Sequence, residues 1–372
     1  DPKGGGLAAL EKFLEPTLVV IPDAVLLSKN DCYSLQAAML QHCGFKMQNR
    51  FAVLDVYDGF KERTFDEDDV IDSFREGVGS NFLQWGASYY PYLHTTVVQA
   101  SEIDFTRFDN VDGLVEVLTK DVTDKLAAGL LTEPRSQQLT TEIDKLSTTT
   151  SPDLVKTLNA TISTICPIYN LIVAEMSEML NLLPPSPALA GAYTMVDVKA
   201  SVAQSPANIS LGSVVSPSVN INSDNQEDLN MPLNGKAVNA IRSFQGKGTL
   251  VWGARTLEGN SKDYRYVSVR RTMIFLEQSI KFAAQAFVFA PNNATTWSTL
   301  RATVANFLTN QWSSGLLAGQ STDDAFSVEI GLGSTMTPND ILDGILKMTI
   351  KVAITRPAEF IVITFEQQQQ KS

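Results

Sequence analysis

The C-terminal end of the chain is the feature that most restricts its fold. Residues 347–356 alternate between apolar and polar side chains, which predicts a strand with one buried face. After Pro357, the segment 358–366 is apolar on both faces. Such a strand would template aggregation if it stayed an exposed edge. It must be covered inside its own fold or be added to the sheet of another subunit.

The N-terminal residues alternate between strand and helix patterns. Apolar runs at 17–24 and 50–57 predict two strands, and the segments 31–43 and 66–77 predict two helices. A third strand is predicted near 88–98. Strands and helices that alternate at this spacing are typical of an α/β layer.

A helical stretch is predicted at 110–183. Apolar residues step by three or four along one face of 153–183, and we expect Pro167 to interrupt that helix. The prolines within 184–187 should end it. Residues 201–233 are rich in Ser, Asn, Pro and Gln, which indicates a long surface connection that could include short strands.

Ordered structure is expected again after this connection. The predicted elements are a strand at 249–253, helices at 266–287 and 297–310, and strands at 325–332 and 347–356. We therefore predict a mixed α/β (α+β) fold of layered sheets and helices. Its first part is residues 1–233 and its second part is residues 234–372, which ends in an arm at 357–372.

Charge is divided unevenly along the chain, whose net charge is −12. Residues 1–233 carry 15 Lys and Arg against 31 Asp and Glu, whereas residues 234–372 carry 14 against 10. The acidic total argues against nucleic acid as a partner. The division suggests two faces with different neighbours, although ordinary solubility charge would also explain it. No apolar run is long enough for a membrane span, so direct membrane insertion is not expected.

The sequence contains few candidates for catalytic chemistry. It has two histidines, no G-x-S-x-G elbow and no nucleotide P-loop. Its three cysteines lack the spacing of a zinc site. Asp55 and Asp58, and the acidic run 66–69, fit turns and helix starts better than carboxylate or cation sites. We expect no enzyme activity, no catalytic residue, no metal site and no cofactor.

The chain contains a series of distinctive sequence blocks: 184–193, 205–208, 238–244 with 246–248, 251–257, 264–271, 289–292 with Trp297, and 356–360. These blocks appear in the order found in contractile tail sheath proteins. Residues 184–372 resemble this family clearly, and residues 7–24 and 86–92 resemble it more weakly. The strand-forming N-terminal arm of the family is missing, and the chain begins at Asp1, so we expect a further piece upstream.

The resemblance implies a helical homopolymer that surrounds an inner tube and contracts to drive the tube through a target envelope. Expected partners are further copies of the chain, the inner tube protein, and baseplate and tail terminator proteins. The subunit would be made in the cytoplasm and assembled in a phage tail or a tail-like extracellular particle.

Family arms add strands to neighbouring subunits, which would explain the apolar C-terminal segment. The expected contact residues of this exchanged arm are Glu359, Phe360, Ile361, Val362, Ile363, Thr364 and Phe365. The charge division predicts that the basic part lines the lumen and contacts the inner tube. The candidates for this contact are Arg270, Arg271, Lys281 and Lys347. Alternatively, Arg270 and Arg271 pair internally with Glu277 or with other acids.

Three kinds of assembly protein fit these observations. We favour the sheath of an extracellular contractile injection system, because the chain is compact and has no added immunoglobulin-like domain. The alternatives are the sheath of a contractile phage tail and a non-contractile tail terminator or baseplate adaptor. An adaptor should form closed rings, whereas a sheath forms an open helical polymer.

Overall fold

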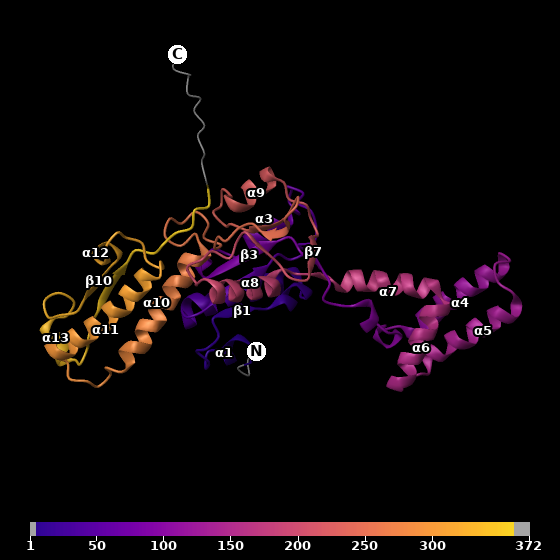
Figure 1. Ribbon diagram of the computed structural model, residues 1–372, viewed down its shortest axis with the longest axis horizontal. Coiled ribbons are helices and arrows are strands. Elements are labelled where there is room, and N and C mark those ends of the chain that lie inside the picture. The colour runs from indigo at the N-terminus through magenta and orange to yellow at the C-terminus, as the bar shows by residue number, and fades with distance from the viewer. Residues whose placement is uncertain (1–4, 361–372) are drawn as a thin grey trace, which may run out of the picture. The chain divides into compact units, whose positions relative to one another are not determined.

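The computed structural model describes residues 5–360 of the chain, which form two compact units (Figure 1). Unit 1 comprises residues 1–91, 184–212 and 219–372, and unit 2 comprises residues 92–183 and 213–218. Each unit has strands, helices and a buried core of its own.

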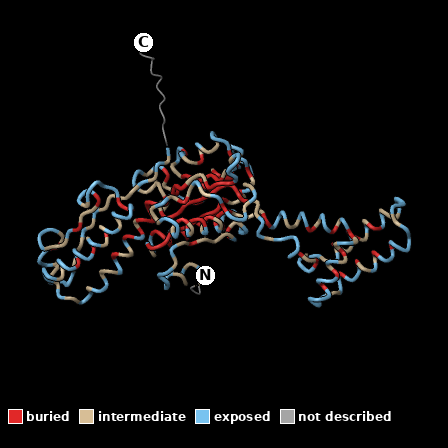
Figure 2. The backbone as a smooth tube through the Cα atoms, viewed as in Figure 1, coloured by how far each residue is buried: buried red, intermediate tan, exposed pale blue. Residues whose placement is uncertain are grey.

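Unit 1 is built on a six-stranded sheet with the order β1-β2-β3-β8-β9-β6. The first four strands are parallel, and β9 and β6 continue the sheet in antiparallel pairings. Their bounds are β1 Leu18–Val20, β2 Phe51–Asp55, β3 Gly86–Tyr90, β6 Ile209–Ser210, β8 Asn239–Phe244 and β9 Gly248–Val251. All residues of β2 and β3 are buried, and Figure 2 shows this concentration of buried residues at the centre of the sheet.

Helices cover both faces of this sheet. Tyr193, on α8 (Ser186–Lys199), packs against Phe51, whereas Leu40, on α2 (Lys29–Gln41), lies over Ala52 and Gly86. Successive side chains of a strand point to opposite faces, so α8 and α2 lie on opposite sides. A Cβ atom at Gly86 would lie 2.5 Å from Leu40 Cδ2, which explains the glycine there. The remaining helices of this region are α1 (Leu7–Leu10), α3 (Val70–Gly77) and α9 (Ser223–Asn230).

The C-terminal part of unit 1 pairs two long helices with a small sheet. Antiparallel strands β10 (Phe326–Glu329) and β11 (Thr349–Val352) lie beside α10 (Val267–Gln285) and α11 (Ala294–Ser313) (Figure 1). The core between them includes Leu276, Ile280, Leu300, Val304, Leu308, Leu317, Ala325 and Val328. Two short helices complete this part, α12 (Thr322–Ala325) and α13 (Pro338–Leu342). The strands and helices predicted from 249 to 356 are all present.

Unit 2 is mainly helical. It contains α4 (Val111–Ala127), α5 (Glu133–Asp144), α6 (Pro152–Ile165) and α7 (Pro167–Leu180), with strands β4 (Leu93–Thr95), β5 (Leu182–Leu183) and β7 (Val214–Pro217) in the order β5-β4-β7. Pro167 separates α6 from α7, and the two helices meet at a bend of 112°. This confirms the predicted interruption. Within residues 5–360, no single helix is long and apolar enough to cross a membrane, and only the bent α6–α7 pair could by length and composition.

The compact units do not divide at the boundary predicted between 233 and 234. Strand β8 pairs with β3, so residues on both sides of that boundary share one sheet. The segment 201–233, expected as a long connection, contains β6, β7 and α9. Helix α8 was not predicted, because the prolines within 184–187 were interpreted only as a stop. Proline also suits the first turn of a helix, where Pro187 lies.

Single turns complete the description. Turns of 3-10 helix lie at Pro22–Leu26, Leu83–Trp85, Ala100–Glu102, Phe105–Arg107 and Lys145–Ser147, and a π-helical turn follows α2 at His42–Met47.

Candidate functional site

Strand β11 has the one-sided burial that its alternating sequence predicts. Ile350 and Val352 pack against the core that α10 and α11 share, and Lys351 is exposed. Among the described residues, the sheet that β11 forms with β10 has two strands only. A two-stranded sheet is marginally stable by itself, and its outer edges offer unpaired backbone groups to further strands.

The chain leaves β11 through a segment that we call the arm root, residues 353–360. Ile354 forms an antiparallel bridge with Leu317, and Thr355 N–H donates to Leu316 O at 3.1 Å. The Thr355 hydroxyl donates to Gly315 O at 2.9 Å. These contacts tie the beginning of the arm root to the end of α11.

Glu359, near the end of the arm root, is held by three side chains of unit 1. Its Oε1 accepts hydrogen bonds from Arg255 Nε at 2.9 Å and from Asn230 Nδ2 at 2.8 Å. Its Oε2 accepts from Arg255 Nη2 at 2.7 Å and from the Tyr266 hydroxyl at 3.0 Å. Burial alone would raise the pKa of Glu359, but the hydrogen bonds and charge of Arg255, with Asn230 and Tyr266, hold it below its usual value.

The rest of the predicted exchanged arm can be placed only in part. Phe360 is the last described residue, and 64% of its surface is exposed. Ile361, Val362, Ile363, Thr364 and Phe365 lie outside the described residues.

Two of the four residues predicted to contact the tube are buried in the subunit. Arg270 Nη2 donates to Glu277 Oε2 at 3.0 Å, and its guanidinium lies 4.1 Å from the centroid of the Trp85 ring. Arg271 forms a two-pronged ion pair with Asp197, in which Nη1 lies 2.9 Å from Oδ1. These pairs match the alternative that both arginines have internal partners.

The two lysines in this prediction are exposed. Lys281 lies on the outer face of α10, near its C-terminal end. Lys347 precedes β11 and forms an ion pair with Asp340. Of the four candidates, only these two are exposed enough to contact another protein without a rearrangement of the subunit.

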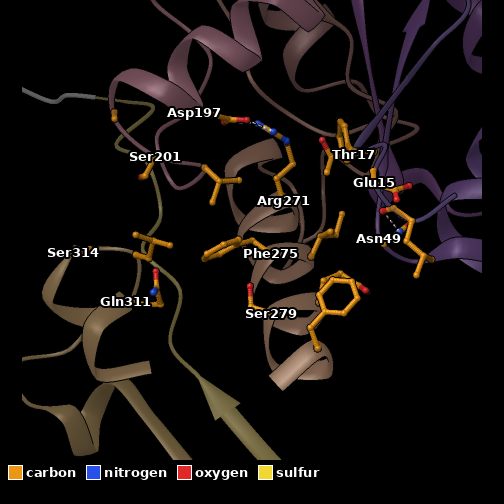
Figure 3. Close-up of a pocket in the computed structure, with 18 residues that line it drawn as sticks. Glu15, Thr17, Asn49, Asp197, Ser201, Arg271, Phe275, Ser279, Gln311 and Ser314 are labelled. Atoms are coloured by element: carbon orange, nitrogen blue, oxygen red, sulfur yellow. Dashed lines mark hydrogen bonds and ion pairs between the residues drawn. The ribbon is translucent and has the colours of Figure 1, made fainter. Parts of the chain in front are cut away.

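An open cavity of about 900 Å³ lies in unit 1 beside α10 (Figure 3). Phe275 and Phe282 contribute large apolar surfaces to its lining. Its charged side chains are Glu15, Asp197 and Arg271, and the last two are paired with each other. A catalytic site would need several titratable groups that converge on one point, and this lining does not supply them. Among residues 5–360, no three His, Cys, Asp or Glu side chains are placed to hold a metal ion.

Sequence reasoning did not identify Arg255 as a functional residue. Arg255 lies in the block 251–257 and Tyr266 in the block 264–271, and both meet the block 356–360 at Glu359. The sequence shows the order of these blocks, but it does not show that the three blocks contact one another in the folded chain. An arginine that follows a buried strand, and a lone glutamate between two apolar residues, were the only available signals.

The chain is similar to known proteins over most of its length. Residues 260–368 match the family model for the phage tail sheath C-terminal domain. No curated protein matches the chain. Solved structures of contractile particles do.

Three of these structures cover nearly all of the chain. The sheath complex of an extracellular contractile injection system, PVC, in its contracted state is 27% identical with a TM-score of 0.59, over 89% of this chain and 68% of that one. The helical sheath of the anti-feeding prophage in its contracted state is 26% identical with a TM-score of 0.62, over 98% and 75%. A chain of the anti-feeding prophage baseplate is 25% identical with a TM-score of 0.62, over 98% and 73%.

The family model, the similar folds and the order of the sequence blocks all indicate the same family. Residues 260–368 carry the C-terminal domain of phage tail sheaths, and the chain as a whole is similar to the sheath proteins of contractile particles.

Proposed function

We propose that this chain is the sheath subunit of an extracellular contractile injection system. The observation that carries the proposal is the similarity over 98% of the chain to the contracted helical sheath of the anti-feeding prophage. The sheath of a second extracellular injection system is similar at 27% identity. The subunit would polymerise helically around an inner tube and contract to drive that tube through a target envelope.

The polymer is held together by exchange of the C-terminal arm. In the described part of the chain, the sheet of β10 and β11 has two strands and lies on the helix pair α10 and α11, so an added strand would extend a sheet that is already packed on one face. The apolar residues that follow Phe360 in the sequence would supply such a strand. Exchange would cover both of its faces, which an exposed terminus cannot do.

Contraction is a movement of subunits as rigid bodies that remain linked by their arms. New surface between subunits forms as the polymer shortens, and burial of apolar area stabilises that state by roughly 25 cal/mol per Å². The subunit has exposed apolar side chains that such contacts could cover, among them Phe275, Phe282, Phe289 and Leu342. Its function therefore lies in assembly and movement, and not in catalysis.

The inner tube, the baseplate and a tail terminator are the proposed partners. The similarity to a chain of the anti-feeding prophage baseplate supports a baseplate contact. Lys281 and Lys347, the exposed members of the predicted set, are the proposed contacts with the tube. Exposed charge pairs are worth roughly 0–1 kcal/mol each, so the sheath would adhere to the tube and still release it.

The test is negative-stain electron microscopy of the purified chain and of two truncations. We expect hollow, striated tubes from the full chain and from a variant that ends at Glu366, which keeps the apolar segment. A variant that ends at Phe360 should give monomers or short fragments, because it lacks the strand that neighbours share.

Closed rings from all three proteins would contradict the sheath proposal and favour a tail terminator or baseplate adaptor. A phage tail sheath is the second candidate, since the matching family model is that of phage tail sheaths. It would also form tubes. Isolation of the native particle separates the two, because a phage carries a DNA-filled capsid on its tail.

A further inference from the structure

Arg255, which holds Glu359, is itself fixed to the central sheet. It is 1% exposed, and its Nη1 donates to Asn230 O at 3.0 Å and to Gly259 O at 3.3 Å. The side chain of Asn239, at the start of β8, makes two hydrogen bonds with the backbone of Arg255. Arg255 N–H donates to Asn239 Oδ1 at 2.7 Å, and Asn239 Nδ2 donates to Arg255 O at 2.8 Å. Contacts that do not involve Glu359 therefore also hold Arg255 in place.

The short chain between Thr355 and Glu359 makes this contact internal to one subunit. Thr355 is bonded to Leu316 and Gly315 of its own subunit. Glu359 follows four residues later, and four extended residues reach about 14 Å at most. The Arg255 of the same chain lies within that reach, so a neighbour's Arg255 is not needed to complete the contact.

Separation of Glu359 from Arg255 would be unfavourable in free energy. Both Nε and Nη2 of the guanidinium donate to the carboxylate, and such charge-assisted, bidentate contacts are stronger than neutral hydrogen bonds. Without Glu359, the buried Arg255 would lose its counter-charge and keep only backbone carbonyls as partners.

We propose that Arg255 and Glu359 form a clamp that keeps the arm root on its own subunit, so that only residues beyond Phe360 are exchanged between neighbours. This inference rests on the proposed sheath function. It removes Glu359 from the exchanged strand, where the sequence had placed it, and makes it a positioning residue. The free part of the arm would then begin after Phe360.

The clamp also gives the arm a fixed starting point. The arm of each subunit would leave the body at the same place and in the same direction before and after contraction. A neighbour's sheet could then receive the strand in one register, since the register of a strand with two apolar faces is otherwise weakly specified.

The test uses a spin label at residue 358, next to the clamp. Ala358 is exposed, and the three cysteines of the chain are buried, so Ala358→Cys supplies one accessible thiol for labelling. Electron paramagnetic resonance of the unassembled subunit should show restricted motion of this label. Glu359→Gln and Glu359→Ala should shift the spectrum to the narrow lines of a mobile chain.

Asp263→Asn is the matched control. Asp263 pairs with Arg356 of the arm root at 3.9 Å, but 83% of its side chain is exposed. Loss of this pair should leave the label restricted. Circular dichroism of each variant should show the parent helix content, which separates release of the arm root from misfolding.

Assembly supplies the second readout. Glu359→Gln should reduce the yield or length of the tubes, whereas Asp263→Asn should not. Equal label mobility in the parent and in Glu359→Gln would overturn the clamp. A mobile label with unchanged tubes would overturn its role in positioning the arm. Absence of tubes from the parent chain would overturn the sheath function, while the label would still report on the clamp.

Discussion

The carboxylate of Asp55 accepts hydrogen bonds from both the backbone N–H and the hydroxyl of Ser186. The Ser186 N to Asp55 Oδ1 distance is 2.8 Å, and the hydroxyl donates to Oδ2. Asp55 ends β2 and Ser186 begins α8, so this contact attaches the start of the helix to the sheet. Burial raises the pKa of Asp55 to about 7, although the two hydrogen bonds from Ser186 act to lower it.

This buried carboxyl should make stability depend on pH. An aspartate in the unfolded chain releases its proton near pH 4. The folded protein keeps that proton up to about pH 7, so it binds more protons than the unfolded chain between these values. The free energy of unfolding should therefore fall as pH rises from about 4 to about 7.

Asp55→Asn should remove this part of the pH dependence. The amide oxygen can still accept from Ser186 N–H, and the amide nitrogen can donate to the Ser186 hydroxyl. Urea unfolding at pH 5 and pH 8 measures the effect: the parent should lose a few kcal/mol more than the variant between the two pH values. Asp23→Asn, at an exposed aspartate, is the control. Equal losses in the parent and in Asp55→Asn would contradict the prediction.

Asp228 should stabilise unit 1 by pairing with two buried arginines. Its Oδ2 accepts from Arg63 Nη1, and also from Arg75 Nη1 at 3.1 Å. The side chains of Arg63 and Arg75 are 3% and 2% exposed. Burial would raise the pKa of Asp228, but the hydrogen bond from Arg63 and the charge of Arg75 hold it below its usual value.

Asp228→Ala should lower the free energy of unfolding by about 1–3 kcal/mol at neutral pH. The loss is smaller than for a fully buried pair, because Asp228 is partly exposed and other carboxylates still contact both arginines. Glu227→Ala removes an exposed carboxylate from the same helix and should change stability by less than about 0.5 kcal/mol. Similar losses in both variants would show that the arginines do not depend on Asp228.

The helices and strands whose formation depends on residues close together in the sequence could be predicted from local patterns. The alternation of 347–356 predicted β11, and Pro167 predicted the break between α6 and α7. The acidic residues at 66–69 predicted a helix start, and Asp69 does cap α3 by accepting from Ile71 and Asp72.

Contacts between distant segments were not predictable in this way. The sequence favours a turn or N-cap role for Asp55, but it does not show that the partner, Ser186, is 131 positions away. Glu359 is predicted as part of the exchanged arm, and nothing in the sequence indicates its contact with Arg255, 104 positions earlier. Periodicity shows which face of an element is buried, but not which segment covers it.

Tyr89 on β3 and Tyr193 on α8, whose hydroxyl groups pair between the sheet and the helix, should behave as a unit. The hydroxyl groups of Tyr89 and Tyr193 are 2.7 Å apart, and both residues are fully buried. Tyr193→Phe should cost about 1–3 kcal/mol, because the Tyr89 hydroxyl would be left without its partner. The double variant Tyr89→Phe with Tyr193→Phe should cost less than the sum of the two single changes. Urea unfolding of all four proteins gives the coupling energy, and additive losses would mean that the hydroxyl groups act independently.

Unit 2 should unfold as a separate unit, because it has its own core. Ile162, on α6, is fully buried in that core, and Ile162→Ala should destabilise it by about 2–5 kcal/mol. The four tryptophans, Trp85, Trp252, Trp297 and Trp312, all lie in unit 1. Circular dichroism should therefore show an earlier loss of helix in the variant, while tryptophan fluorescence changes at the same urea concentration as in the parent.

The control for Ile162 is Leu171→Ala on α7, where the side chain is 71% exposed. It should leave both signals unchanged. If Ile162→Ala shifted the fluorescence and circular dichroism transitions together, the two units would unfold as one.

Lys281 should contribute to the attachment between sheath and tube if the basic part of the chain faces the lumen. One exposed ion pair is worth roughly 0–1 kcal/mol, but every subunit along the polymer repeats it. Lys281→Glu should therefore lower the amount of tube protein that purifies with the sheath, and the difference should shrink as salt is added. Lys262→Glu makes the same charge change at another exposed lysine and should keep the tube bound. If both variants retained the tube equally well across the salt series, attachment would not depend on the charge of α10, and the exposed apolar side chains of unit 1 would be the surfaces to substitute next.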